Sequence, residues 1–349
     1  MKALVLTAYK QFEYRDTPDP RPGRDEVLIK VAACGICGSD VHGMDGSSGR
    51  RIPPIIMGHE AAGVIVEMGR EVRGFRVGER VTFDSTVYCG ECFFCRRGEM
   101  NLCDNRRVLG VSTDEYRRNG AFAEYVVAPE RILYRLPKGL PFEHAALVEA
   151  TSIAVHAVGR PPIHLGDAAV VVGTGMIGLF VVQALRAAGV HRVIAVDIDQ
   201  TRLDLARTLG ATEAIRSDQS DAVAEIRKLT EGRGADLAFE VVGATPTLKV
   251  ATEGVRKGGS VTLVGNLARQ ADLQLQSVVT RQVTLYGSCA SSGEYPVCLD
   301  MLNRKVIQAE PIISAVAPLQ EGGAWFDRLY RREPGLMKVI LAPAMPVPA

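Results

Sequence analysis

The sequence has few aromatic residues and almost no excess of either charge. Its 349 residues include one tryptophan, and aromatic residues together make up 6%. Lysine plus arginine number 41 and aspartate plus glutamate 40, which gives a formal net charge of +1. Such a balance supplies no basic surface for a phosphate backbone. We therefore do not expect nucleic-acid binding as the main function.

Long hydrophobic runs are scarce as well. The longest uncharged run, residues 168–185, contains Gly173, Gly175 and Gly178, so we interpret it as a strand, a turn and a helix rather than a membrane span. The N-terminal segment has too short an apolar stretch for a signal peptide, and no A-x-A cleavage site follows it. These features predict a soluble, cytoplasmic protein that does not bind membranes.

Short apolar runs are abundant, and the chain is long enough for about two domains. Up to about residue 150 the runs are brief and separated by glycine and proline, which indicates a β-rich region. From about residue 166, strand-like and helix-like runs alternate, which predicts an α/β fold with a parallel, doubly wound sheet. The predicted strands are 168–172, 192–196, 236–239 and 260–264, and the predicted helices are 176–188, 200–209, 220–230 and 246–255. A last strand is predicted at 337–341, before a proline-rich tail for which we expect disorder.

A glycine-rich motif predicts dinucleotide binding. The apolar run 170–172 leads into G-x-G-x-x-G, which comprises Gly173, Gly175, Met176, Ile177 and Gly178 together with Thr174. Glycine permits the tight turn and close approach of a pyrophosphate, and the following helix directs its N-terminus at the anion. An acidic residue at the end of the next strand strengthens this interpretation. An ordinary glycine-rich turn is the weaker alternative.

That acidic residue, Asp197, favours NAD over NADP. Its carboxylate would accept hydrogen bonds from the adenosine ribose and repel a 2′-phosphate. Asp197 or Asp199 could also cap the helix that begins near residue 200. Arg202 is the only basic side chain that we expect close by. A solvated helix face is the more ordinary place for it, but we include it among the cofactor-binding candidates. The other candidates are Val242, Val264, Gly265 and Ser288.

Two groups of residues have the chemistry of metal ligands. Cys89, Cys92, Cys95 and Cys103 form C-x2-C-x2-C-x7-C, a spacing typical of a structural zinc site. Disulfides and an iron–sulfur cluster are the alternatives. The second group is dispersed and consists of Cys37, Ser39, Asp40, His42, His59, Glu60 and Glu149. A cysteine, a histidine and a carboxylate suit a catalytic zinc site, although each residue alone could have a structural role.

Taken together, the motifs closely resemble the zinc-dependent medium-chain dehydrogenases, which include alcohol and polyol dehydrogenases. The resemblance rests on GICGSDVH at 35–42, GHEAAGVI at 58–65, VGERV at 77–81, the four-cysteine lobe, LVEATSIAVHA at 147–157 and GTGMIG at 173–178. It implies a GroES-like catalytic domain at 1–150 and 288–349, with the structural-zinc lobe at about 86–105. It also implies a Rossmann NAD-binding domain at 151–287 and a homo-oligomer, either a tetramer or a dimer.

The resemblance further implies a role for each residue of the dispersed group. Cys37 and His59 would bind a catalytic zinc ion, with Asp40 holding the imidazole of His59. Glu60 and Glu149 would share or exchange the third ligand position. Together with the structural zinc of the four-cysteine lobe, each chain would hold two zinc ions. Zinc would lower the pKa of an alcohol oxygen, and nicotinamide would accept the hydride. Ser39 would take the proton and pass it through the nicotinamide ribose to His42.

The substrate is less well defined than the reaction. Residues 287–296 resemble a segment of sorbitol dehydrogenase that carries an Arg-Tyr pair for polyol hydroxyls, but this chain has Ala290 and Ser291 there. A polyol, then a vicinal diol or sugar-derived secondary alcohol, then a hydroxy-amino acid such as threonine are the expected classes; a general alcohol dehydrogenase is a further alternative. A catalytically silent nucleotide-binding protein is disfavoured, because the implied zinc ligands and relay residues are all present.

Overall fold

The computed structural model describes residues 1–345, so the end of the predicted disordered tail, 346–349, lies outside the described residues. The chain divides into two compact units. The first consists of Met1–Glu149, Tyr295–Asn303 and the part from Ala309 onward, and the second of Ala150–Glu294 and Arg304–Gln308. No helix within residues 1–345 is both long and apolar enough to cross a lipid bilayer.

The division differs from the predicted domains at residues 288–294 and 304–308, which group with the second unit. The first of these segments follows the last parallel strand directly, and the Ser288 N–H donates to the Leu263 carbonyl at 3.0 Å. The Gln183 side chain binds the backbone carbonyl and N–H of Gln308 at 3.2 and 2.7 Å. These hydrogen bonds attach both segments to the second unit.

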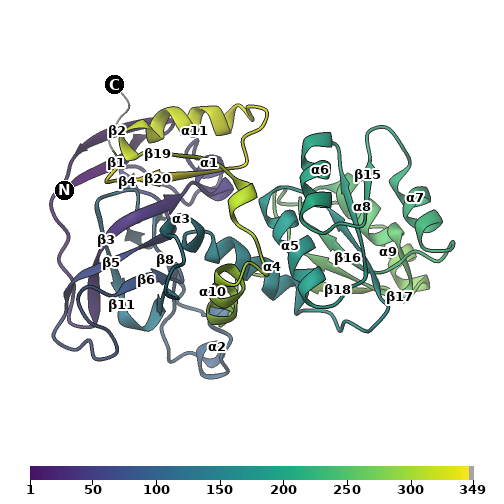
Figure 1. Ribbon diagram of the computed structural model, residues 1–349, viewed down its shortest axis with the longest axis horizontal. Coiled ribbons are helices and arrows are strands. Elements are labelled where there is room, and N and C mark those ends of the chain that lie inside the picture. The colour runs from purple at the N-terminus through teal and green to yellow at the C-terminus, as the bar shows by residue number, and fades with distance from the viewer. Residues whose placement is uncertain (346–349) are drawn as a thin grey trace. The chain divides into compact units, whose positions relative to one another are not determined.

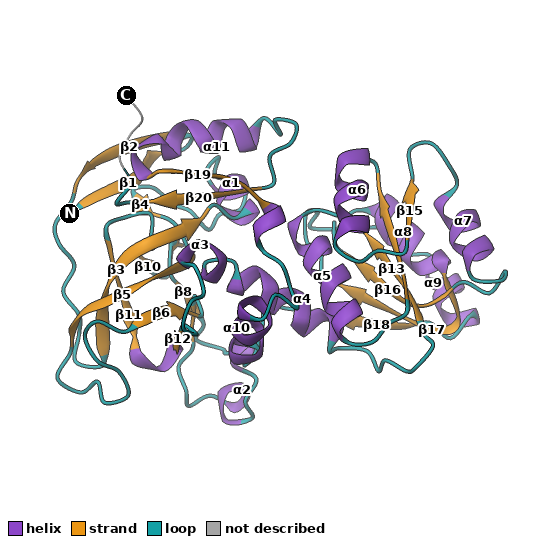
Figure 2. Cartoon of the chain, viewed as in Figure 1, coloured by secondary structure: helices purple, strands orange, loops and turns teal. Residues whose placement is uncertain are grey.

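The first unit is built on a seven-stranded sheet that is mostly antiparallel (Figures 1 and 2). Its order is β12-β6-β5-β3-β20-β19, with β11 also paired to β3. The strands of this unit are β1 (Lys2–Ala8), β2 (Gln11–Asp16), β3 (Glu26–Gly35), β4 (Ile55–Ile56), β5 (Glu60–Met68), β6 (Arg80–Phe83), β7 (Thr86–Val87), β8 (Arg107–Val108), β9 (Val111–Ser112), β10 (Arg117–Arg118), β11 (Tyr125–Pro129), β12 (Leu133–Arg135), β19 (Ile313–Pro318) and β20 (Lys338–Ala342).

Short helices connect these strands. They are α1 (Gly38–Gly43), α2 (Phe93–Arg96), α3 (Phe142–Ala145), α10 (Tyr295–Asn303) and α11 (Gly322–Tyr330), with 3-10 turns η1 (Met100–Leu102), η2 (Glu130–Ile132), η3 (Glu310–Ile312) and η4 (Leu319–Glu321). Helix α4 (Val148–Val158) begins in this unit and continues into the second. Residues of β1, β3 and β5 enter a core that also includes Phe83, Phe122 and Phe326. The sheet can therefore hold polar side chains rigidly where its strands end.

The second unit is a parallel sheet with the order β15-β14-β13-β16-β17-β18. This order reverses direction beside β13, which is the arrangement of dinucleotide-binding sheets. The strands are β13 (Ala168–Val172), β14 (Arg192–Asp197), β15 (Glu213–Arg216), β16 (Ala235–Glu240), β17 (Val255–Leu263) and β18 (Thr284–Gly287). The helices are α5 (Met176–Ala187), α6 (Gln200–Thr208), α7 (Ala222–Leu229), α8 (Thr245–Gly254) and α9 (Leu275–Thr280). The predicted doubly wound α/β fold is confirmed.

Helices and strands of this unit pack as the sequence pattern predicts. Helix α5 contacts β13 and β14, and α8 contacts β13, β16 and β17. Continuous apolar strands such as 170–172 are buried because helices cover a parallel sheet. The predicted strand 168–172 has the observed bounds, and most other predicted elements differ by one or two residues. Strand β17 is the exception: it begins at Val255, five residues before the predicted start.

Candidate functional site

Three predicted metal ligands meet in the first unit. The Sγ of Cys37, a ring nitrogen of His59 and a carboxylate oxygen of Glu60 all lie within 4.8 Å of one another. His59 and Glu60 are buried, whereas Cys37 is half-buried. Cys37 comes from one segment of the chain and the neighbouring residues His59 and Glu60 from another, so only the folded sheet brings the three atoms together.

The ends of two neighbouring strands position these ligands. Strand β3 ends at Gly35, two residues before Cys37, and β5 begins at Glu60, one residue after His59. Gly35 and Glu60 are register partners in the antiparallel pair β3–β5. Cys37 has an extended conformation and directly precedes α1, so it lies at the turn between strand and helix. The motifs at 35–42 and 58–65 therefore converge because their strands pair.

A buried ion-pair network orients His59. The Asp40 Oδ2 lies 3.3 Å from the His59 Nδ1, and the Arg51 Nε and Nη2 donate to the Asp40 Oδ1 at 3.1 and 2.8 Å. Burial alone would raise the pKa of the Asp40 carboxyl, but His59 and Arg51 outweigh burial and hold that pKa well below its usual range. Because Asp40 faces Nδ1, the His59 Nε2 is directed toward the Cys37 side, where it is available for a metal. The role predicted for Asp40 fits this geometry.

Glu60 and Glu149 differ in position. Glu60 belongs to the group of converging ligand atoms, whereas Glu149, in the first turn of α4, does not. Part of Glu149 still contacts solvent, yet its carboxyl is withdrawn enough that burial raises its pKa to about 7. His59 and Glu60 are among the charges that act on it. Glu149 is therefore close to the site, and its exchange with Glu60 stays a prediction.

The predicted relay residues lie on α1. Ser39 and His42 are both exposed and are three residues apart, so the helix places them on one face. The Ser39 Oγ donates to the Cys37 Sγ at 3.4 Å and lies 3.5 Å from the His59 Nε2. The hydroxyl therefore contacts two of the metal-ligand side chains, and the imidazole of His42 faces solvent.

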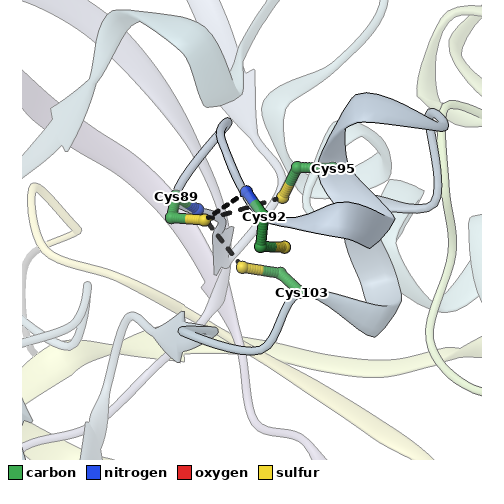
Figure 3. Close-up of side chains that lie close together, drawn as sticks. All are labelled: Cys89, Cys92, Cys95 and Cys103. Carbon is green, nitrogen blue, oxygen red and sulfur yellow. Dashed lines mark hydrogen bonds between the residues drawn. The ribbon is translucent and has the colours of Figure 1, made fainter.

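The four predicted lobe cysteines form a second cluster (Figure 3). Their sulfur atoms point toward one another from the segment around α2 and η1. The Sγ atoms of Cys89 and Cys95 are 3.9 Å apart, about twice the ~2.05 Å length of a disulfide bond. The spacing suits four thiolates around one ion rather than disulfides.

Backbone groups also prepare this cluster for a cation. The Cys89 Sγ accepts the Cys92 N–H at 3.4 Å, and the Cys103 Sγ accepts the Cys89 N–H at 3.3 Å. N–H groups of residues 91 and 92 lower the pKa of the Cys89 thiol to about 6, whereas burial raises that of Cys95 to about 12. At least one thiolate is thus favoured near neutral pH, and a bound cation would stabilise the rest.

The predicted cofactor residues all follow or end parallel strands of the second unit. Gly173 follows β13, Asp197 ends β14, Val242 follows β16, Val264 and Gly265 follow β17, and Ser288 follows β18. In parallel sheets, ligands bind at the carboxyl ends of the strands beside the point where the order reverses. Gly173 has a φ of +96°, and a Cβ at Gly178 would lie 1.9 Å from the Gly173 carbonyl oxygen. The two positions therefore require glycine, as the motif predicts.

Asp197 is fixed toward the glycine turn. Its Oδ2 accepts the Thr174 N–H at 2.6 Å and the Thr174 hydroxyl at 2.9 Å, and its Oδ1 accepts the N–H groups of Ile198 and Asp199. Asp199, not Asp197, caps α6. Arg202 is half-buried and lies 3.8 Å from Asp199. The interpretation of Arg202 as the only nearby basic residue is wrong: Arg216 is the register partner of Asp197 on β15, and it binds Asp218.

In the segment expected to recognise polyol hydroxyls, Ser291 is not exposed to a substrate. This residue is buried, and its Oγ accepts a hydrogen bond from the Ser152 Oγ at 3.0 Å. Nearby, the His156 Nδ1 lies 2.7 Å from the Glu294 carboxylate. Ala290 has a φ of +51°, which is unusual for a residue other than glycine. Where the Arg-Tyr pair is expected, this chain therefore has a left-handed alanine and a buried serine.

The sequence analysis missed two buried cations. Arg51 binds Asp40 as described, and its Nη2 also lies 3.5 Å from the Ser39 Oγ. Lys338 begins β20, is fully buried, and contacts the Glu60 carboxylate. Burial lowers the pKa of Lys338, but Glu60 outweighs this effect and raises it. A charge inside the apolar run 337–341 was the available signal for Lys338.

The donor set fits a zinc ion at each cluster. In the first, the Glu60 Oε1 is buried and has no hydrogen-bond partner within residues 1–345, so a buried acceptor is left for a cation. Thiolate, imidazole and carboxylate are the ligands of catalytic zinc sites, and four thiolates are those of structural ones. A cation would also compensate the negative charge that these ligands bring into a buried region.

Two family models match the chain. "Alcohol dehydrogenase GroES-like domain" matches residues 23–138, and "Zinc-binding dehydrogenase" matches residues 177–304. Among curated relatives, sorbitol dehydrogenase of Bacillus subtilis is 32% identical over 98% of this chain and 97% of its own. D-arabitol-phosphate dehydrogenase of Enterococcus avium is 33% identical, over 92% and 91%. L-threonine 3-dehydrogenase of Pyrococcus horikoshii is 36% identical, over 77% and 76%.

Solved structures agree with these matches. A protein from Sinorhizobium meliloti 1021, described as a zinc-binding dehydrogenase and bound to NADP, has a TM-score of 0.90 and 31% identity, covering 98% of this chain and 99% of its own. A short chain alcohol dehydrogenase from E. coli CFT073 complexed with NADH also has a TM-score of 0.90, with 29% identity over 98% and 99%. Similar folds thus hold either nicotinamide cofactor.

Proposed function

Because the chain belongs to the zinc-type medium-chain dehydrogenase family, we propose that it oxidises a secondary alcohol to a ketone with NAD. The single observation that carries this proposal is the convergence of Cys37, His59 and Glu60 within 4.8 Å, at the end of the sheet that also presents Ser39. A silent member of the family would have no need to retain this arrangement. The preferred substrates are polyols, sugar alcohols or vicinal diols.

In this proposal Cys37, His59 and Glu60 hold a catalytic zinc ion, and the four lobe cysteines hold a structural one. Bound zinc supplies polarisation of the alcohol oxygen, and nicotinamide supplies a hydride acceptor. Asp40, fixed by Arg51, keeps the His59 ring oriented with Nε2 toward the site. Ser39 accepts the proton from the substrate hydroxyl at its Oγ, and His42 receives it at the exposed end of α1.

Asp197 supports the preference for NAD. Its carboxylate is held at the carboxyl end of β14 by Thr174 and by the two following N–H groups. A 2′-phosphate placed there would face a fixed negative charge. Arg216 is close enough in register to be the residue that a 2′-phosphate would need, but Asp218 engages its guanidinium. We therefore infer that NADP is the poorer cofactor.

The substrate class rests on the relatives and on one local feature. Relatives that act on sorbitol and arabitol phosphate support a polyol. This chain lacks the Arg-Tyr pair that would anchor a long polyol, and Ser291 in its place is hydrogen-bonded to Ser152. The substitution favours a shorter diol or a sugar-derived alcohol as substrate. A threonine dehydrogenase-like activity is the second candidate, supported by the relative of that name.

The decisive experiment measures NADH formation by the purified, zinc-loaded protein on a panel of polyols, vicinal diols, sugar alcohol phosphates and L-threonine. We expect turnover with at least one polyol or diol, and no turnover for Cys37→Ser with the same panel. A variant at an exposed residue away from the site, Glu231→Gln, is the control. Oxidation of L-threonine alone would replace the proposal by its second candidate. The same panel is run with NADP in place of NAD. Absence of turnover with every substrate, with either NAD or NADP, would contradict an oxidoreductase of this specificity.

A further inference from the structure

Lys338 is a buried cation that the proposed mechanism does not use. Burying an ammonium group is costly unless it is paired and hydrogen-bonded. Both of its partners adjoin the metal-ligand cluster: its Nζ contacts the Glu60 Oε2 and donates to the Ile36 carbonyl at 3.0 Å. Ile36 directly precedes Cys37. The lysine therefore connects the end of the chain to both segments that supply ligands.

The contact crosses a strand. In the sheet order β5-β3-β20, Gly35 of β3 pairs with Glu60 on one side and with Ile340 on the other (Figure 1). Strands two places apart are separated by about 10 Å, so Lys338 and Glu60 must extend over β3 to meet. A Cβ at Gly35 would lie 2.6 Å from the Glu60 Oε2 and 3.2 Å from the Lys338 Nζ. Glycine at position 35 thus leaves the space in which the pair forms.

The ion pair between Lys338 and Glu60 engages only one of the two carboxylate oxygens of Glu60. Lys338 holds Oε2, while Oε1 is buried without a hydrogen-bond partner in the described part of the chain. A carboxylate oxygen of Glu60 is one of the three converging ligand atoms. We propose that Lys338 is a positioning residue for the metal site: it holds one oxygen of Glu60 across Gly35 and leaves the other oxygen for the metal. Because lysine and metal compete for the same carboxylate, Lys338 also weakens metal binding.

A purely structural ion pair makes a different prediction. If Lys338 only stabilised the fold, its removal would lower the stability of the metal-loaded and metal-free protein equally. If it competes with the metal, its removal leaves Glu60 without a cation only in the metal-free protein. The metal then binds more tightly, because it alone compensates the carboxylate.

The test measures zinc binding to Lys338→Met by competition with a chromophoric chelator, together with thermal melting in both metal states. We expect the dissociation constant of the zinc at this site to fall by about tenfold or more, the size of effect typical of groups around metal ligands. The gap in Tm between loaded and metal-free protein should widen. Lys338→Gln, which retains a donor for the Ile36 carbonyl but no charge, should give the same result if Lys338→Met fails to fold.

Controls separate this effect from general destabilisation. Arg118→Met removes a half-buried pair with Glu26 at the opposite end of β3 and should leave the zinc affinity unchanged. In a Glu60→Gln background, Lys338→Met should change the affinity much less, because the lysine acts through Glu60. An unchanged or weakened affinity in Lys338→Met and Lys338→Gln, or equal changes in Tm in both metal states, would overturn the proposal.

The inference rests on the proposed function only for the identity of the metal. Zinc affinity is measured without substrate or nucleotide. A protein that binds zinc as predicted but oxidises none of the panel alcohols would contradict the proposed function and leave the role of Lys338 intact. A protein that binds no zinc at Cys37, His59 and Glu60 would contradict the role of Lys338.

Discussion

Ser39 and His42 are polar side chains of the short helix α1 that remain exposed beside buried metal ligands. Asp40, on the same helix, is fully buried and serves His59 and Arg51 instead. In the proposed function, this short helix separates two tasks: it orients a ligand on its inner side and moves a proton on its outer side. Substitutions on the two sides should have different consequences.

For His42→Ala we expect both zinc ions and NAD affinity to be retained. Alcohol oxidation should slow by about 10²-fold or less, the usual contribution of one general base. The loss should be largest at low pH and partly recovered as pH rises, when hydroxide or buffer takes the proton. The measurement is kcat against pH with zinc content determined in parallel. Loss of the catalytic zinc, or a wild-type rate at every pH, would show that His42 is not in the relay.

Asp197→Ala should narrow the preference for NAD. The substitution removes an acceptor for the ribose hydroxyls and lifts the repulsion of a 2′-phosphate, so kcat/KM should fall with NAD and rise with NADP. Asp221→Ala, which removes the cap of α7, is the comparison and should lower helix stability without changing the cofactor ratio. A wild-type protein that prefers NADP would refute the assignment.

At the scale of elements, we expect the stability of the four-cysteine lobe to depend on a metal more than on packing. Helix α2 has only four residues, none of them buried, and Phe93 is two-thirds exposed. Such a segment buries too little apolar surface to fold by itself, and metal ligation can supply the missing stability.

Cys103→Ser should therefore remove one metal ion per chain and lower the Tm by several degrees, without directly abolishing substrate binding. A metal assay and a thermal melt of the purified variant check both effects. Cys289→Ser should change neither. If Cys103→Ser retained two metal ions per chain, the lobe would not be a metal site.

A carboxylate connects neighbouring strands of the parallel sheet near their amino ends. Asp236 of β16 accepts the Ala168 N–H at 2.8 Å, at the start of β13, and pairs with Arg256 of β17. Burial alone would raise the pKa of Asp236, but the Ala168 N–H and Arg256 outweigh it and lower the pKa below its usual 3.8. The stabilisation from ionised Asp236 is therefore complete above about pH 4 and is lost as pH falls through the lowered pKa.

Asp236→Asn should lower the free energy of unfolding by about 1 kcal/mol at neutral pH, since the pair is partly screened by water. The difference from wild type should shrink below pH 4, where the wild-type carboxyl also becomes neutral. Urea unfolding at pH 7, 5 and 3 measures it. Asp218→Asn, at an exposed pair, should show little effect. A constant difference across this range would mean that the charge of Asp236 does not matter.

The elements of the second unit were largely predictable because their signals are local. Apolar run, glycine turn and helix follow one another within residues 168–187, and each step has its own sequence pattern. Lys338 and Arg51 were not predictable as site residues, because nothing near them in sequence identifies their partners Glu60 and Asp40. Pairing of β3 with β5 and β20 brings Lys338 to Glu60, and strand pairing is a property of the whole sheet. Arg51 reaches Asp40 of α1 from an isolated bridge with Ser112, which is 61 residues later in the chain.

At the scale of the molecule, the two clusters should hold two zinc ions per chain. Seven ligand candidates form two groups of different chemistry, one of four thiolates and one mixed, and Glu149 is close to the mixed group. Metal analysis of purified protein should give a ratio near two, which falls to about one in Cys103→Ser and in Cys37→Ser. A ratio of one or zero, with no other metal, would refute the assignment of two sites. Iron in place of zinc would revive the iron–sulfur alternative for the lobe.

The late position of β20 in the chain has a consequence for biosynthesis. Ribosomes deliver the chain from its N-terminus, and domains fold as their residues emerge, at about 5–20 residues per second. The nucleotide-binding unit is nearly contiguous, whereas β3 must wait for β20, which is made only after that whole unit. During that interval the end of β3 lacks its neighbour, and Glu60 lacks its cation. A nascent chain therefore completes its nucleotide-binding sheet first and the cluster of Cys37, His59 and Glu60 after it.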